Sequence, residues 1–194
     1  MSEALPGCLM TDFRLLPFAE LYCRILNLCS RYCLAVDDRD LDALVGLFTR
    51  DGVFDAVHGP ITGREAIRGY YVMRLSAYGP TLHYAHGLTI HEIDAHEVTC
   101  SVSAHAELAI GGAFQVVALR YSDRFAEEDG QLRFRSRSTR VLYSSPVDQL
   151  PVIFNDEFRS RWPGTDLARA DIPETLTTWQ TFYRDPSGVP SPSQ

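Results

Sequence analysis

The hydrophobic period of this chain changes once, close to Gly79-Pro80, and that change limits the folds that the chain can adopt. Before it, apolar residues recur every three or four positions, as in amphipathic helices; after it, they alternate with polar residues, as in half-buried strands. Helices followed by long strands are typical of α+β domains, in which an antiparallel sheet carries helices on one face. The sequence therefore predicts an α+β fold.

The helical half of the pattern contains three candidate helices. They cover residues 18–36, 40–48 and 64–75, and the first of them has the most regular apolar stripe. Pro17 suits the first turn of that helix, and the carboxylate of Asp40 can cap the second. Between the second and third helices, residues 53–58 are expected to form a strand that a loop follows.

The alternating half contains four long runs, which glycine and acidic residues separate. We expect strands at residues 82–93, 97–110, 113–125 and 131–143. A long, strongly twisted sheet must curl, and a curled sheet that helices cover leaves a pocket at its mouth. The predicted fold therefore offers a site for a small molecule between the helices and the sheet.

The two ends of the chain differ in composition from this centre. We divide the sequence into an N-terminal arm (residues 1–15), an α+β domain (16–145) and a C-terminal extension (146–194). The extension is rich in proline and contains both tryptophans, Trp162 and Trp179, and short helices are expected at 153–161 and 173–183. Its aromatic residues predict partial docking on the domain or on a neighbouring subunit, whereas the last residues, from 186, are expected to be disordered.

Composition narrows the set of partners. With 194 residues, a formal charge of -7 and scattered arginines, the chain has one core and no basic stripe, which argues against nucleic acid and anionic membranes. Residues 1–15 match neither a signal peptide nor a membrane span. The five cysteines contain no CxxC pair, so we interpret them as free thiols, mostly buried, in a cytoplasmic protein. A hydrophobic small molecule is the expected partner.

The candidate catalytic residues lie at the end of the first helix and at the start of the first long strand. Asp37 and Tyr32 lie at the predicted end of the first helix, and His83 lies at the start of the first long strand. A carboxylate that binds one ring nitrogen of a histidine holds the other nitrogen free as a base, and a tyrosine can donate to a developing oxyanion or a leaving group. A helix-capping role for Asp37 and a hydrogen-bonded core role for His83 are the structural alternatives.

Three segments carry a resemblance to a known family: YCLAVDDRDLDALVGLFTRDGVF, GREAIRGYY and LHYAHGLTIHEIDAHEV. In the order and spacing of these segments, residues 18–143 resemble the SnoaL-like proteins of the nuclear transport factor two-like superfamily. Within it they resemble most of all the group of scytalone dehydratase and bile acid 7α-dehydratase. The resemblance implies a cone-shaped α+β barrel, in which three N-terminal helices pack against a strongly curved, mixed but mainly antiparallel sheet. It also implies a cofactor-independent elimination that uses an Asp-His pair.

Carried over residue by residue, the resemblance places the catalytic pair on Asp37 and His83 and the helix tyrosine on Tyr32. Other positions depart from the dehydratases: a pocket histidine falls near Leu108, a second tyrosine near Asp55 or Ala56, and a late arginine one position from Arg140. The expected substrate-binding residues are Asp55, His86, Leu108, Tyr121 and Arg140. These departures predict a substrate different from that of either dehydratase.

Three classes of function stay open at this stage. The first is a lyase, isomerase or cyclase that acts on a polyketide-, steroid- or terpenoid-like molecule, either through the Asp37–His83 pair or, as in steroid isomerases, through Tyr32 and Asp55. The second is a binding protein without turnover, and the third is a scaffold like the small subunits of ring-hydroxylating oxygenases. No metal site is expected, because His83, His86 and His91 do not share one face of a strand. The polar outer sheet face and the aromatic extension predict a homo-oligomer, a dimer or trimer.

Overall fold

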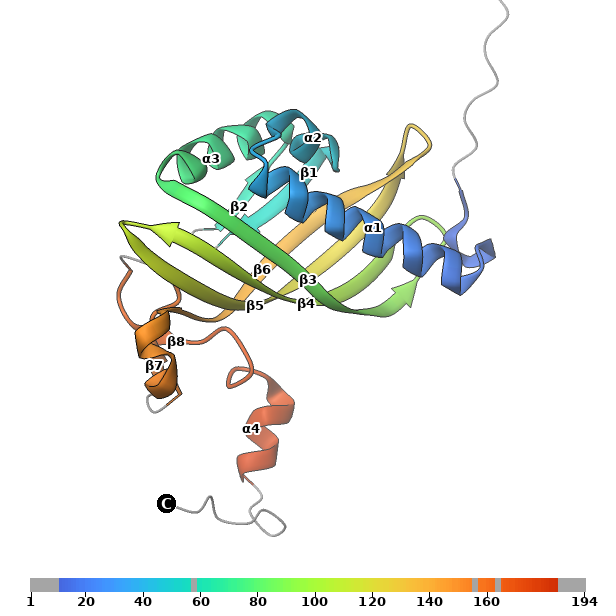
Figure 1. Cartoon of the computed structure of the whole chain (residues 1–194). Coiled ribbons are helices and arrows are strands. Elements are labelled where there is room, and N and C mark those ends of the chain that lie inside the picture. Colours follow the sequence, from blue (N-terminus) through green and yellow to red (C-terminus); the bar gives the residue numbers. More distant parts are fainter. Residues whose placement is uncertain (1–10, 57–58, 155–156, 163–164, 185–194) are drawn as a thin grey trace, which may run out of the picture.

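A large curved sheet holds three helices on its concave side (Figure 1). The computed structural model describes residues 11–56, 59–154, 157–162 and 165–184. After a short 3-10 turn, η1 (Phe13–Leu15), come the three helices α1 (Phe18–Asp37), α2 (Leu41–Gly46) and α3 (Arg64–Ser76). The sheet strands are β1 (Phe48–Ala56), β2 (Gly59–Thr62), β3 (Tyr78–Ile93), β4 (Val98–Ile110), β5 (Ala113–Glu128) and β6 (Gln131–Pro146).

The six strands follow the order β2-β1-β6-β5-β4-β3, in which β1 pairs in parallel with β6 and the other neighbours are antiparallel. The order ends at β2 on one side and at β3 on the other, so the sheet curls around α1 without closing (Figure 1). The α+β prediction, with a mixed and mainly antiparallel sheet, is confirmed. The expected barrel is an open sheet, and α1 and α3 rather than further strands cover its hollow side.

Helix α1 forms where its sequence period predicts. Its buried residues are spaced by three or four along one face, which packs on the sheet: Leu21, Ile25, Leu28, Tyr32 and Val36. Burial of each large apolar side chain contributes about 1.5–3 kcal/mol relative to exposure. The helix ends at Asp37, and Arg39 follows with a positive φ of 62°, which turns the chain into α2. Asp40 then caps α2 by accepting from the backbone N–H of Ala43 at 2.9 Å.

The strands extend further than the alternation predicts. β3 starts at Tyr78, before the expected position, and β2 occupies a segment that was expected to be a loop. β2 pairs with β1 through Phe54 and Ile61, and it tolerates Pro60 because it lies at the edge of the sheet, where an N–H can be missing. Pairing with a neighbouring strand, rather than local pattern, makes these residues extended.

The C-terminal extension docks on the end of the sheet. It contains η2 (Val147–Val152), β7 (Phe158–Arg159), β8 (Ala168–Arg169) and α4 (Thr177–Arg184), so the helix expected at 153–161 is wrong, and α4 begins later than expected. The backbone N–H of Ser144 donates to Ser160 O at 2.7 Å, and the N–H of Asp171 donates to Val141 O at 3.1 Å. These tertiary hydrogen bonds to β6 hold the segment extended. Residues 186–194, expected to be disordered, lie outside the described residues.

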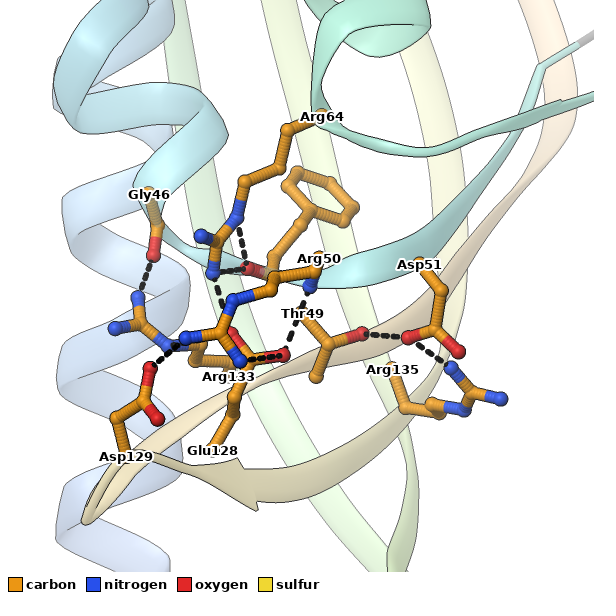
Figure 2. A network of polar contacts seen from close by, with 10 residues as sticks. Gly46, Thr49, Arg50, Asp51, Arg64, Glu128, Asp129, Arg133 and Arg135 are labelled. Carbon is orange, nitrogen blue, oxygen red and sulfur yellow. Dashed lines mark hydrogen bonds and ion pairs between the residues drawn. The ribbon is translucent and has the colours of Figure 1, made fainter.

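Salt bridges tie the helices to one end of the sheet (Figure 2). Glu128, at the tip of the β5–β6 hairpin, accepts from Arg64 Nη2 at 2.8 Å and from the backbone N–H of Arg50 at 3.0 Å. Arg64 also donates to Phe48 O through Nη2 at 2.6 Å and Nε at 2.9 Å, while Arg133 donates to Gly46 O. This network anchors α2 and the start of α3, and so helps to position the part of α3 that covers the sheet.

Candidate active site

A cavity of about 70 Å³ lies between the helices α1 and α3 and the concave face of the sheet. Its wall is mostly apolar, with Val36, Leu75, Ala106 and Leu108 among the aliphatic side chains. The phenylalanine, tyrosine and tryptophan side chains that contribute to it are Tyr32, Phe54, Tyr70, Tyr71, Tyr78, Tyr121 and Trp162. Such a cavity suits a hydrophobic molecule, which a small number of polar groups would orient.

The polar side of the cavity contains His83, which is bonded to the carboxylate of Asp37. His83 Nδ1 lies 2.6 Å from Asp37 Oδ1, and the backbone N–H of His83 donates to Asp37 Oδ2 at 2.8 Å. The two side chains are largely buried, at 16% and 13% exposure. Because the carboxylate engages Nδ1, the imidazole is held with Nε2 away from Asp37, and no residue of the described chain binds Nε2.

Asp37 lies in an environment that keeps it ionised. Burial raises the pKa of its carboxyl, but the hydrogen bonds and charge of His83 and the hydroxyl of Thr81 oppose burial, and the resulting pKa lies below the usual value. Thr81 Oγ1 donates to Asp37 Oδ1 at 2.9 Å. A carboxylate next to the imidazole favours the imidazolium that forms when His83 takes a proton.

Two residues that the sequence analysis did not select support this carboxylate. Arg39 donates to Thr81 Oγ1 at 2.7 Å and to Gly79 O at 2.6 Å, so hydrogen bonds run from Arg39 through Thr81 and Asp37 to His83. The strand alternation offered a signal for Thr81, which lies two residues before His83 and therefore on the same face of β3. For Arg39 the sequence carried no signal, because its turn conformation brings it to β3.

Tyr32 lines the cavity as a buried, neutral hydroxyl. Burial raises its pKa to about 12, and its Oη shares a short hydrogen bond with Tyr71 Oη. Burial also raises the pKa of Tyr71 well above its ordinary value. Both phenols therefore keep their protons near neutral pH and can act as hydrogen-bond donors. The sequence predicts only a helix at Tyr71 and carries no signal for its role in the cavity.

The remaining predicted residues divide between the two faces of the sheet. Leu108 and Tyr121 line the cavity, whereas Asp55, His86 and Arg140 do not. Asp55 lies between the cavity residues Phe54 and Ala56 and accepts from Ser138 Oγ at 2.8 Å, so it points to the opposite face. Tyr32 and Asp55 therefore do not share a cavity, contrary to what the isomerase-like alternative requires.

His86 and Arg140 are on the outer side of the sheet for similar reasons. His86 is exposed, with Nε2 at 2.5 Å from His105 Nδ1 and the two rings stacked. Arg140 is exposed and follows Thr139, which lines the cavity. Strand alternation therefore excludes both from the wall, so neither lies where a substrate-binding residue was expected.

Arg74 and Trp162 also line the cavity, although the sequence analysis did not select them. Arg74 comes from α3, and its guanidinium carbon lies 4.5 Å from the centroid of Trp162 in the extension. Trp162 Nε1 donates to Tyr78 Oη at 3.0 Å. The extension thus supplies part of the wall of the cavity in its own chain.

The sequence profile of the SnoaL-like domain matches residues 18–138 of this chain. The chain belongs to the SnoaL-like family. The matched segment contains Asp37 and His83 and ends before the extension that carries Trp162. No curated protein matches the chain.

Many solved structures share the fold of this SnoaL-like chain. A scytalone dehydratase-like protein from Novosphingobium aromaticivorans has a TM-score of 0.61 at 19% identity, over 66% of this chain and 88% of its own. The hexachlorocyclohexane dehydrochlorinase LinA-type3 from Novosphingobium barchaimii has a TM-score of 0.59 at 20% identity, over 66% and 91%. A variant of Rv3472, a protein of unknown function from Mycobacterium tuberculosis, has a TM-score of 0.60 at 29% identity, over 73% and 83%.

Two properties of the described residues bear on possible partners. None of the helices there is both long and apolar enough to span a bilayer. In the same residues, no group of three or more histidine, cysteine or acidic side chains has the geometry to hold a metal ion. Cys29, Cys33 and Cys100 are buried free thiols, and Cys23 is exposed and free.

Proposed function

We propose that this SnoaL-like protein is a cofactor-independent lyase that removes a proton from a hydrophobic small molecule and expels water or halide. The observation that carries the proposal is the hydrogen bond of 2.6 Å between His83 Nδ1 and the ionised Asp37, at the wall of an aromatic cavity. Isomerisation or cyclisation of the same kind of substrate would use the same base. A polyketide-, steroid- or terpenoid-like ring system has the apolar surface that the wall can cover.

Each residue would have a distinct task. His83 Nε2 takes the proton from carbon, and the charge of Asp37 stabilises the imidazolium that results. Tyr32 or Tyr71 donates a hydrogen bond to the leaving group or the developing oxyanion, which needs a phenol that keeps its proton. The family and the neighbours with dehydratase-like and dehydrochlorinase names support an elimination over other chemistry.

The proposal can be tested without the natural substrate, with 5-nitrobenzisoxazole as a probe for a base in an apolar cavity. Removal of the ring C–H proton by His83 forms the C≡N bond and breaks the N–O bond, which releases a coloured cyanophenolate. His83→Gln keeps a polar side chain of similar size but removes the base, so turnover should fall at least about a hundredfold. Asp37→Asn should also lower it strongly, because an amide supplies no charge to the imidazolium. Tyr32→Phe should have a smaller effect, since water can replace a lost donor.

His91→Gln is the matched control, because His91 lies on the same strand but is exposed and bonded to Ser101 Oγ at 2.8 Å. It should keep the turnover of the unchanged protein. Equal turnover in His83→Gln and His91→Gln would contradict the proposed base. Unchanged probe binding with no turnover in any variant would instead identify a binding protein.

A further inference from the structure

The mouth of the cavity, where the lining residues Arg74, Tyr78 and Trp162 are partly exposed, contains a guanidinium that the proposed reaction does not use. Arg74 lines the cavity, and its guanidinium carbon lies over three rings, 4.5 Å from the centroid of Trp162, 5.5 Å from Tyr78 and 5.8 Å from Tyr70. These rings come from the helix α3, the strand β3 and the extension. Three separate parts of the chain therefore meet around one positive charge.

The charge of Arg74 has no carboxylate partner in the part of the chain that the structure describes. Several other arginines on or next to the sheet are paired with a carboxylate: Arg64 with Glu128, Arg137 with Asp123, and Arg135 with Asp51. Among the described residues, Arg74 instead contacts the three rings and the nearby hydroxyl of Tyr78. An arginine that stacks on aromatic faces still offers the N–H donors at the edge of its plane, in the fork that matches a carboxylate.

We infer that Arg74 recognises a carboxylate on the substrate, so that the cavity takes an apolar acid rather than a neutral hydrocarbon or ketone. This inference rests on the proposed function, since it names the substrate class of the same cavity. The carboxylate would bind the edge of the Arg74 guanidinium at the mouth, and the apolar body would lie along the aromatic wall. The reacting carbon would then face His83, which lines the same cavity.

Trp162 has a positioning role in this arrangement. Its ring covers the guanidinium of Arg74 and so restricts the orientation of the arginine. Its own indole N–H donates to Tyr78 Oη at 3.0 Å, which fixes the ring in this position. Ring contact on one side removes water from the guanidinium and so strengthens its attraction for an anion. The extension is therefore part of the binding site for the acid group.

The experiment compares two probes that share one apolar body, 2-naphthoic acid and methyl 2-naphthoate, at pH 7, where the acid is ionised and the ester is neutral. Trp179→Phe leaves Trp162 as the only tryptophan, and quenching of its fluorescence reports binding at the mouth. In this background the acid should bind more tightly than the ester. Arg74→Gln should weaken binding of the acid about tenfold or more and leave the ester unchanged, because the lost interaction is a charge-assisted hydrogen bond.

Arg24→Gln is the matched control, since Arg24 lies on the outside of α1 in a salt bridge with Glu20. It should change the affinity for neither probe. Equal affinity of acid and ester, undetectable binding of the acid, or equal weakening of both probes by Arg74→Gln would overturn the inference, the last by showing that Arg74 only holds Trp162.

Failure of this inference can be told apart from failure of the proposed function. His83→Gln should still bind 2-naphthoic acid with preference over the ester, because the base does not contact the carboxylate. If the acid preference depends on Arg74 while His83→Gln keeps full turnover of 5-nitrobenzisoxazole, the recognition of acids stands and the proposed base does not.

Discussion

The carboxylate of Asp37 accepts the hydrogen bonds that orient His83 on the polar side of the cavity. Its two oxygens accept from His83 Nδ1, the backbone N–H of His83 and Thr81 Oγ1. Asp37 ends α1, and the other two residues begin β3, so the carboxylate joins a helix end to a strand. These hydrogen bonds therefore contribute to the stability of the fold as well as to the orientation of His83. The pH dependence of the free energy of unfolding shows how much of that stability depends on the charge of Asp37.

We predict that Asp37→Asn lowers the free energy of unfolding by about 1.5–3 kcal/mol at pH 7, the range for hydrogen bonds to charged groups. The folded protein holds the pKa of Asp37 below the ordinary value of 3.8, so its stabilisation is present above pH 3.8 and is lost as the pH falls through the folded-state pKa. The difference between the two proteins should therefore shrink below about pH 4. Urea unfolding at pH 7, 5 and 3 measures it.

Asp38→Asn provides the control, because Asp38 is adjacent but exposed. It should change the free energy of unfolding little at any of these pH values. A loss for Asp37→Asn that is as large at pH 3 as at pH 7 would show that the lost stability comes from shape rather than charge.

At the scale of elements, a buried ion pair joins β5 and β6 beneath α1. Arg137 and Asp123 are both fully or almost fully buried, with Nε to Oδ1 at 2.9 Å and Nη2 to Oδ2 at 2.7 Å. The guanidinium carbon lies 4.2 Å from the ring centroid of Tyr32 and 4.0 Å from that of Tyr121. The guanidinium of the pair thus packs against two tyrosine rings that line the cavity.

We predict that Arg137→Met destabilises the protein by about 3–5 kcal/mol, because it leaves the charge of Asp123 buried without a partner. Arg137→Met combined with Asp123→Leu should recover most of that loss, since both charges then leave the core. Thermal and urea unfolding measure both variants, with Arg124→Met, at an exposed salt bridge to Glu97, as the control. A double variant less stable than the single one would show that the pair itself stabilises the fold.

At the scale of the whole molecule, apolar side chains remain exposed on two surfaces. The helix α4 and the residue before it expose four of them: Leu176, Trp179, Phe182 and Tyr183. On the sheet, Leu82, Tyr84 and Phe114 are 49%, 40% and 51% exposed. Exposed apolar groups that cluster in this way mark surfaces that bind other proteins.

We predict that the chain forms a homo-oligomer, a dimer or trimer, and that its interface covers part of these two surfaces. Light scattering on a sizing column at micromolar concentration should give two or three times the chain mass of 21.8 kDa. Trp179→Glu combined with Phe182→Glu tests α4, and a lower mass for this variant would assign α4 to the interface. A mass of one chain for the unchanged protein would contradict the prediction.

Local pattern determined most of the elements of this protein. The apolar stripe of residues 18–36 and the alternation from residue 82 have periods that a helix and a half-buried strand require, and the structure has α1 and the long strands there. The strand β2 and the start of β3 escaped prediction because they become extended through pairing with neighbours. Strand β7 is likewise extended through pairing with β8, with Phe158 opposite Arg169 and Arg159 opposite Ala168.

The candidate site divides in the same way. Residue types, order and family resemblance select Asp37, His83 and Tyr32 from the sequence, because their chemistry and spacing are local properties of the chain. Tertiary structure alone brings Arg39 to Thr81, Tyr71 to Tyr32, and Arg74 to Trp162, since each pair is joined by contacts between elements far apart in sequence. Strand alternation places Asp55, His86 and Arg140 on the face opposite the cavity residues next to them, and the packed helices decide which of the two faces is inside.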